Sequence, residues 1–413
     1  MIDLDALDFA ALVRPGDLVC WGQASAEPVA LTRRLMAERA RIGTFSAFIG
    51  ISLTETPDPA YTDCVRFSSF CGTGTNRRLA AAGKLDILPI HYSDLPGVLR
   101  ERVDVLLLQV AEHPDGGRYS LSCASDYVAE LVKAARVVIA EVNRQAPFTA
   151  AGIAVQDIDV MIRTDRPVPH MAPSAPGAVE RSIAANVAAL VQDGATLQFG
   201  LGALPDCVAD LLSDRRDLGL HTGVMGDGAM RLMQCGAITN ARKPVETGIS
   251  VAGTLLGSGE LLAFANLNPA IKLCPNGFTH APGVLAALPG FTAINSALEV
   301  DLSGQINTET IAGRYVGAVG GAIDFLRGAR AAQGGLPIVA LPSTVEVRGE
   351  RRSRIVTRLS GPATIPRADS AIIVTEHGVA DLRGQSLEAR ARKLIAIADP
   401  QFQDALAAAS NLR

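Results

Sequence analysis

The sequence of 413 residues lacks several patterns that mark specialised classes of protein. Its seven cysteines include no Cys-x-x-Cys pair or other metal-ligand spacing, which favours reduced thiols and no metal site. The longest apolar runs, such as residues 105–108, are far shorter than the ~20 residues of a membrane span. The first residues are acidic and show no secretory pattern. These absences predict a cytoplasmic protein that crosses no membrane.

An excess of positive charge is also missing. The formal net charge is −4, and the lysines and arginines are scattered along the chain, which argues against nucleic acid or an anionic membrane as a partner. Hydrophobic residues make up 48% and charged residues 19%, as in well-packed globular proteins. A chain of this length exceeds what one core usually serves, so two domains are the simplest expectation.

A proline-rich segment divides the chain. Residues 166–177 carry four prolines and no periodic apolar pattern, which is typical of a connector. We therefore expect an N-terminal lobe over residues 1–165, a linker over 166–179 and a C-terminal lobe over 180–413.

The two halves share similar segments in the same order, which predicts a tandem duplication. Their apolar runs of four to six residues are continuous rather than alternating, as in parallel strands that helices cover on both faces. The fold class is therefore α/β, with two related open α/β lobes. The paired segments are residues 15–22 with 193–200, 104–110 with 297–302, and 135–141 with 370–376.

Two glycine-bearing segments are candidate ligand sites, because ligands collect beyond the carboxyl ends of strands in open α/β sheets. Residues 200–205 follow an apolar run and open a helix, so their bare N–H groups suit an anion, although a structural tight turn fits equally well. Gly317, Gly320 and Gly321 form a second cluster, which indicates close approach of a ligand or another strand.

Several ordered segments resemble the acetyl-CoA hydrolase/transferase family, nearest its 4-hydroxybutyrate CoA-transferase branch. The resemblance extends from Pro15 to Leu406. It implies the two-lobed CoA-transferase fold, coenzyme A as a substrate or product thioester without metal, and acyl-CoA and a small-molecule acceptor as partners. The matching segments are residues 200–206, 218–222, 294–305, 320–325 and 374–384.

In that family a glutamate attacks the acyl-CoA carbonyl, and the resulting anhydride becomes a glutamyl-CoA thioester that a second carboxylic acid resolves. The resemblance implies that the backbone N–H groups near Leu201 and Gly321 form the oxyanion hole. It also implies that Glu376 stands beside the reacting carbonyl. The residues expected to bind coenzyme A are Gly200, Leu201, Gly202, Ala203, Leu204, Gly317, Gly320 and Gly321.

This chain departs from the family pattern at three places. Gly223 stands where the nucleophilic glutamate directly follows the His-Thr pair, and a glycine cannot attack a thioester. His280 and Ala281 stand where relatives usually carry an asparagine and an acidic residue, and Ala322 stands where close relatives often have glutamine. The departures lie in or near the segments expected to face the substrate.

Four interpretations follow. In the first, which we favour, an acceptor attacks the thioester directly, with Glu376 or His280 as general base. In the second, Glu299 replaces the missing nucleophile. The third is a non-catalytic sensor or partner subunit that binds a CoA ester, and in the fourth the local match misleads and ordinary transferase chemistry persists. The acyl group, the acceptor and the oligomeric state stay open, with a homodimer as one option.

Other residues carry competing interpretations. His221 either points at the ligand or packs within its loop. Cys207 and Cys274 could be nucleophiles, but lone cysteines are more often small buried hydrophobes. The arginine-rich run over residues 348–354 could reach the phosphates of coenzyme A, although a solvated hairpin of mixed charge is the favoured interpretation.

Overall fold

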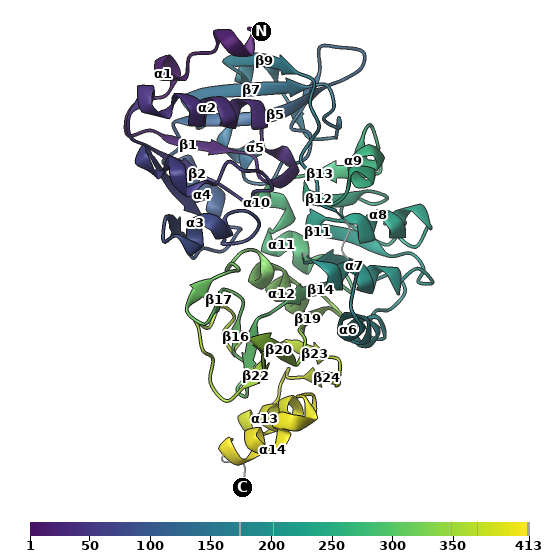
Figure 1. Ribbon diagram of the computed structural model, residues 1–413. Helices are drawn as coiled ribbons and strands as arrows, with labels where there is room; N and C mark the ends of the chain where they lie inside the picture. The colour runs from purple at the N-terminus through teal and green to yellow at the C-terminus, as the bar shows by residue number, and fades with distance from the viewer. Residues whose placement is uncertain (173–174, 201, 348, 370, 411–413) are drawn as a thin grey trace. The chain divides into compact units, whose positions relative to one another are not determined.

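The protein is a mixed α/β structure, seen in a computed structural model that describes residues 1–172, 175–200, 202–347, 349–369 and 371–410 (Figure 1). Its core is formed by two large, mainly parallel sheets, which confirms the expected α/β class. Among the described residues, no helix combines the length and apolar character that a membrane crossing needs.

Contacts divide the chain into two compact units. The first comprises Met1–Pro173, Gly223–Met225 and Ile249–Thr279, and the second comprises Ser174–Thr222, Gly226–Gly248 and His280–Arg413. The first division falls inside the expected linker, whereas residues 249–279 group with the first unit. The lobe boundaries 1–165 and 180–413 stay a prediction for the folding units.

The first unit is built on a sheet whose parallel strands follow the order β4-β3-β2-β1-β5-β7-β9. Its central strands are apolar because both faces are covered, and Val19, Trp21 and Leu107 belong to one buried cluster. The strands are β1 (Leu18–Trp21), β2 (Phe45–Phe48), β3 (Val65–Ser69), β4 (Leu85–Ile87), β5 (Val105–Glu112), β7 (Val137–Asn143) and β9 (Val160–Thr164), with short antiparallel β6 (Tyr119–Ser120) and β8 (Gly152–Ile153). The helices are α1 (Phe9–Leu12), α2 (Val29–Ile42), α3 (Arg77–Ala81), α4 (Leu95–Arg100) and α5 (Val128–Leu131), with 3-10 turns at η1 (Leu4–Ala6), η2 (Ala24–Ala26), η3 (Pro59–Asp63) and η4 (Val155–Asp157).

The second large sheet has the order β13-β12-β11-β10-β14-β19-β23, with β24 antiparallel at its edge. Strand β11 passes from the second unit into the first after Thr222, and β12 and β13 belong to the first unit. The strands are β10 (Thr196–Phe199), β11 (Gly219–Met225), β12 (Ser250–Leu255), β13 (Ile271–Leu273), β14 (Thr292–Ser296), β19 (Leu336–Ala340), β23 (Ile372–Thr375) and β24 (Gly378–Asp381).

The two sheets place their strands in the same succession along the chain. In each, the first four strands run outward from a central first strand, and the next three continue on its other side. This order pairs β1 with β10, as the first pair of similar segments predicts. The same order pairs β5 with β14 and β7 with β19. The predicted partner of β5, residues 297–302, contains β15 instead of β14, and the predicted partner of β7, residues 370–376, contains β23 instead of β19, so both predicted pairings are wrong. The duplication itself stays a prediction.

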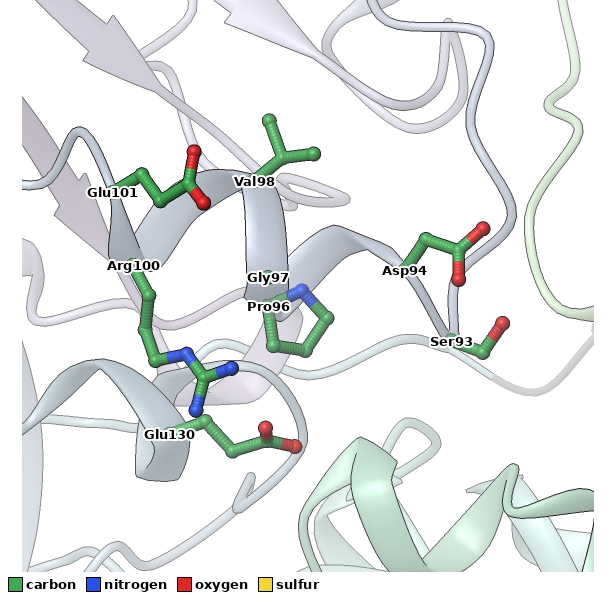
Figure 2. Close-up of a pocket in the computed structure, with 8 residues that line it drawn as sticks. All are labelled: Ser93, Asp94, Pro96, Gly97, Val98, Arg100, Glu101 and Glu130. Atoms are coloured by element: carbon green, nitrogen blue, oxygen red, sulfur yellow. The ribbon is translucent and has the colours of Figure 1, made fainter.

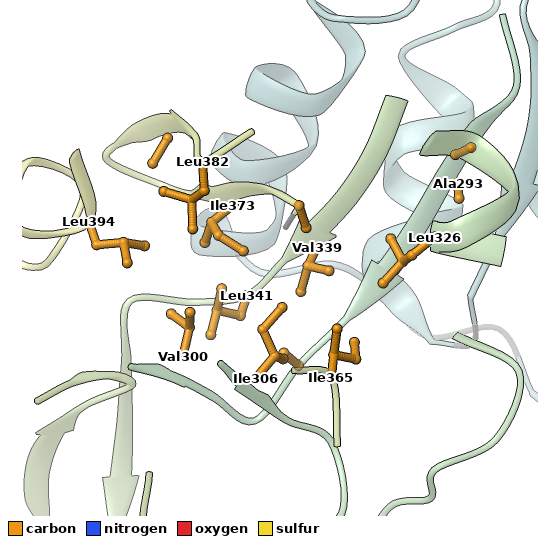
Figure 3. Close-up of a cluster of buried hydrophobic side chains, with 14 of the residues drawn as sticks. Ala293, Val300, Ile306, Leu326, Val339, Leu341, Ile365, Ile373, Leu382 and Leu394 are labelled. Atoms are coloured by element: carbon orange, nitrogen blue, oxygen red, sulfur yellow. The ribbon is translucent and has the colours of Figure 1, made fainter. Parts of the chain in front are cut away.

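Smaller elements of the second unit pack on a shared core. Strands β15, β16 and β22 form a three-stranded sheet, and Val300, Ile306 and Leu341 lie in the buried cluster beneath it (Figure 3). Burying each such side chain contributes roughly 1.5–3 kcal/mol to the free energy of unfolding. This packing holds the small sheet, and the loops that leave it, in place. These strands are β15 (Glu299–Asp301), β16 (Ile306–Asn307) and β22 (Ile355–Val356); two hairpins join β17 (Thr310–Ile311) to β18 (Arg314–Tyr315) and β20 (Thr344–Val347) to β21 (Glu350–Ser353).

The helices that complete the fold follow the strands in both units. Those of the second unit are α6 (Ala178–Ala188), α7 (Ala203–Asp210), α8 (Asp227–Gln234), α11 (Pro282–Ala286), α12 (Ala322–Ala331), α13 (Leu387–Ala396) and α14 (Pro400–Ala409). Helices α9 (Gly259–Ala265) and α10 (Asn276–Thr279) belong to the first unit.

Candidate functional site

The carboxyl edge of the second unit's parallel strands brings several expected site segments to one end of a sheet. Gly200 directly follows β10, and Glu376 directly follows β23. Between these strands, Asn295 near the end of β14 exchanges amide hydrogen bonds of 2.8 and 3.3 Å with Gln198 of β10. Since ligands of open α/β sheets bind beyond this edge, it is the candidate site.

Helix α7 begins at this edge, and no side chain of the described residues caps its N-terminus. The Gly200 N–H donates to the Ile294 carbonyl of the neighbouring strand β14 over 2.8 Å, which fixes the end of β10. Gly202 caps α7 with φ +117°, a conformation open mainly to glycine, and no described side chain accepts from the first N–H groups of the helix. Ala203 and Leu204 form the first turn. Leu201 lies outside the described residues. The expected anion site therefore has its backbone donors available.

Helix α12 offers a second uncapped N-terminus. Gly321 caps it without a side-chain hydrogen bond, and Gly320 has φ +57°. A Cβ at Gly321 would lie 2.6 Å from Nε2 of His280, so only glycine leaves room for that ring. Gly317 is different, because a Cβ there would lie 1.9 Å from the Thr308 carbonyl oxygen. The chain itself makes the close approach at Gly317, and a role for Gly317 in binding coenzyme A stays a prediction.

The two candidate histidines are buried in an aromatic cluster. His280 is 2% exposed with its ring centroid 4.5 Å from that of Phe325, and the His221 ring, which is fully buried, lies 6.5 Å from Phe291. Burial, with a smaller contribution from His221, lowers the pKa of His280 to about 3. His280 is therefore neutral at pH 7 and a weak base. This environment favours packing against Gly321 over proton transfer.

Glu376 is a fixed carboxylate at the sheet edge. Its Oε2 accepts from the Ser343 backbone N–H over 2.9 Å, and its Oε1 accepts from Ser343 Oγ over 2.6 Å. Its side chain is 11% exposed, and Nε2 of His377 lies 3.7 Å from Oε1. Each oxygen keeps a second lone pair, so the carboxylate can still accept a proton from a ligand.

Glu299 is held in the same way, but on the small sheet. It accepts from the Ser360 N–H over 3.0 Å and from Ser360 Oγ over 2.6 Å, and Asn307 Nδ2 lies 3.4 Å from Oε2. These bonds order the loop around Ser360. They are what a strand-end structural carboxylate makes, and nucleophilic use of Glu299 stays a prediction.

Sequence reasoning includes Arg354 only as the last residue of the arginine-rich run and does not single it out; Arg354 follows the β20–β21 hairpin. Its N–H donates to the Ser343 carbonyl over 2.8 Å, and its carbonyl accepts from the Val300 N–H over 2.9 Å. The backbone of Arg354 is therefore bonded both to Ser343, which binds Glu376, and to Val300, which follows Glu299 in the sequence. Its partial burial could be expected only from the pattern Ser-Arg-Ile-Val, in which a lone arginine directly precedes a short apolar strand.

The hairpin before Arg354 has the mixed charge that the sequence predicts. Arg352 pairs with Glu350 at 2.8 Å, and Arg351 pairs with Asp399 at 2.6 Å. With these partners, the two arginines are engaged within the protein rather than free for phosphate.

The two cysteine candidates are buried residues, one of them within α7. Cys207 and Cys274 are buried, and burial raises the pKa of Cys207, which disfavours a thiolate nucleophile. Within the described ranges, no three His, Cys, Asp or Glu side chains are grouped to hold a metal. The first unit carries a pocket of about 350 Å³ with Arg100, Glu101 and Glu130 at one side and Ser93 and Asp94 at the other (Figure 2).

Comparison with known proteins agrees with this architecture. Residues 4–172 match the acetyl-CoA hydrolase/transferase N-terminal domain, and residues 257–410 match the C-terminal domain of the same name. The chain is 36% identical over 338 residues to the 4-hydroxybutyrate coenzyme A transferase of Clostridium kluyveri, which covers 81% of this chain and 79% of that protein.

Two solved structures extend the likeness to the fold. RipA from Yersinia pestis superposes with a TM-score of 0.92 at 32% identity and covers 99% of each chain. The 4-hydroxybutyrate CoA-transferase of Porphyromonas gingivalis superposes with a TM-score of 0.82 at 31% identity and covers 99% of this chain and 96% of that one.

The parallel sheets and the matching solved structures define an α/β protein of the CoA-transferase fold, and the relatives indicate an enzyme that uses acyl-CoA, either a transferase or a thioester hydrolase. More particularly, the chain belongs to the acetyl-CoA hydrolase/transferase family.

Proposed function

We propose that this protein transfers the acyl group of a CoA thioester directly to an acceptor, without a glutamyl-CoA intermediate. The observation that carries the proposal is the glycine at position 223. Gly223 is buried within β11 immediately after His221 and Thr222, where the resemblance expects the nucleophilic glutamate. A glycine offers no carboxylate, so a covalent relay would need another residue.

The other candidate carboxylates are poor replacements. Glu376 and Glu299 each have both oxygens bound to the N–H and hydroxyl of one serine. Two hydrogen bonds that hold both oxygens leave such a carboxylate little freedom to turn towards a carbonyl carbon, whereas its free lone pairs can still accept a proton. This arrangement favours Glu376 as a general base. The weak basicity of buried His280 points the same way.

The step balances with the groups present at the edge. The acceptor oxygen bonds to the thioester carbonyl carbon, the C–S bond breaks, and coenzyme A leaves as a thiolate. With water as acceptor, Glu376 takes the proton released and returns it to the thiolate. With a carboxylate as acceptor, the thiolate then attacks the acceptor carbonyl of the free anhydride and forms the new thioester. N–H groups at α7 and α12 would stabilise the oxyanion, each worth roughly 3–4 kcal/mol.

Borohydride trapping tests the missing intermediate. After incubation with acetyl-CoA and butyryl-CoA, we expect peptide mass analysis to find no glutamate reduced to its alcohol. A reduced Glu299 or Glu376 would overturn the proposal and favour an ordinary transferase with a substitute nucleophile.

Initial rates give an independent test. Direct transfer needs acyl-CoA and acceptor bound together, so double-reciprocal plots should intersect, whereas a covalent relay gives parallel ping-pong lines. If no thiol is released with water, carboxylates, amines or alcohols while coenzyme A esters still bind, the protein is a sensor.

The relatives make one engineered change informative. The similar protein from Clostridium kluyveri is a 4-hydroxybutyrate coenzyme A transferase. In Gly223→Glu, the appearance of carboxylate-dependent CoA transfer with ping-pong kinetics would indicate that the rest of a transferase site is retained. No gain of this kind would indicate a pocket adapted to another acceptor. A cytoplasmic location and a homodimer are parts of the same proposal, and fractionation and sedimentation would test them.

A further inference from the structure

The guanidinium of Arg354 feels the charge of Glu376 but has no contact partner of its own among the described residues. Among the described residues, it makes no side-chain hydrogen bond, and no carboxylate lies within the 4.0 Å of an ion pair. The nearby Arg351, in contrast, is paired with Asp399 at 2.6 Å.

Partial burial nevertheless acts on this side chain. Loss of solvent lowers the pKa of Arg354 despite the opposing effect of Glu376, Glu299 and Glu180. The guanidinium has therefore lost water, and no contacting carboxylate has replaced it. None of its nitrogens is among the fully enclosed polar atoms that lack a hydrogen bond, so a ligand can reach them.

We infer that Arg354 binds a carboxylate of the substrate, either at the end of the acyl chain or on the free acid that accepts it. Its planar fork of N–H donors matches two carboxylate oxygens. Its backbone bond to Ser343, which also holds Glu376, fixes it next to the proposed general base. The inference rests on the proposed function in taking acyl-CoA as the ligand.

The surrounding charge favours a carboxylate over a phosphate. Glu180, Glu299 and Glu376 all act on Arg354, so the neighbourhood is already negative. A phosphate would bring up to two further charges into it, whereas a carboxylate brings one that the guanidinium neutralises. The phosphates of coenzyme A are therefore the less suitable ligand.

Calorimetry with unreactive thioethers tests the inference without turnover. S-(3-carboxypropyl)-CoA and S-butyl-CoA differ only in a terminal carboxylate or methyl, and butyrate and butyramide differ only in the carboxylate or amide of a free acceptor. We expect the wild type to prefer the carboxylate by about tenfold or more in one of these pairs, as charged hydrogen bonds typically give. The pair that shows the preference identifies the source.

Arg354→Gln should remove this preference and leave the affinity for S-butyl-CoA within about twofold. Arg354→Lys should keep part of it, and the control Arg352→Gln, in the adjacent hairpin, should keep all of it. Equal weakening of every CoA compound by Arg354→Gln would instead indicate contact with phosphate or pantetheine and would overturn the inference.

The wild-type measurements stand even if Arg354→Gln fails to fold. No preference in either pair would overturn the inference while leaving direct transfer intact. If neither thioether binds, the proposed function fails, and butyrate against butyramide alone decides the role of Arg354.

Discussion

The two large sheets share a strand order but finish their carboxyl edges differently. After β1, the chain enters η2 and reaches Glu27, a buried carboxylate that accepts from hydroxyls of Thr32, Ser52 and Thr54 at 2.9–3.0 Å. After β10, the chain enters α7 through an uncapped glycine. At the first edge the Glu27 carboxylate is enclosed by hydroxyls of the protein, whereas at the second edge no side chain in the described ranges caps the α7 N-terminus. The same topology thus carries an internally bonded carboxylate in one place and the candidate ligand site in the other.

The largest expected effect is a loss of activity from a change at the carboxyl edge of the second sheet. Glu376→Gln should lower the rate of thiol release by about 100-fold or more, since a general base typically contributes 10²–10⁴-fold. Its free energy of unfolding should change by less than about 1 kcal/mol, because the glutamine amide still meets Ser343. Glu346→Gln, an exposed change in the same unit, is the control. Full activity in Glu376→Gln would remove this residue from catalysis.

Glu27→Ala should do the reverse in the first unit. Removing the acceptor leaves several buried hydroxyls without it, which costs about 3 kcal/mol of the free energy of unfolding in urea. Affinity for coenzyme A, measured on the folded fraction, should stay unchanged. Glu55→Ala removes a carboxylate that is 82% exposed and should cost less than about 1 kcal/mol. If Glu27→Ala lowers the free energy of unfolding by as little, the hydrogen bonds between Glu27 and the surrounding hydroxyls contribute little to stability.

Stability against pH probes the buried part of the second edge. The folded pKa of His280 is about 3 against 6.5 in the unfolded chain, so its contribution is complete above pH 6.5 and is lost as pH falls towards 3. Between pH 7 and 5 the wild type should lose about 2 kcal/mol more than His280→Gln. Urea unfolding at both pH values measures the difference. Equal losses in the two proteins would show that His280 is not buried as a neutral ring.

The smallest expected effect concerns the helix N-terminus. Gly202→Ala strains a backbone at φ +117°, which costs about 1–2 kcal/mol and should weaken coenzyme A binding about tenfold in calorimetry. Gly259→Ala, at the first residue of α9 with no atom within 4 Å of the added Cβ, is the matched control. If both variants bind coenzyme A equally, the α7 N-terminus is not part of the site.

The sequence predicts the fold class well because buried parallel strands leave long apolar runs. It also places the first strand of each half correctly, since β1 and β10 share a turn, an apolar run and a following glycine. The later pairings fail because residues 297–302 imitate a strand and turn but belong to the small sheet at β15. An apolar run of this length does not reveal which strands lie next to it, so the assignment of a strand to a sheet depends on the tertiary structure.

The candidate site divides in the same way. The glycine caps at Gly202 and Gly321 follow from local patterns, because helix starts and glycine clusters are visible in the sequence. The two hydrogen bonds from Ser343 to Glu376 join residues that are 33 positions apart, and no periodic pattern in the sequence predicts this contact. The weak basicity of His280 depends on burial among side chains from other segments, which composition does not reveal.

The shared strand order also affects how the chain acquires its structure. In the first sheet, Leu18 bonds to Asp104, which is 86 residues away, and in the second, Gln198 bonds to Asn295, which is 97 residues away. The central strand of each sheet must therefore wait, with one side unpaired, until a long stretch of chain has been synthesised. Pairings this distant form slowly and leave apolar edges exposed to aggregation. Both halves should thus depend on chaperones at the same late step of folding.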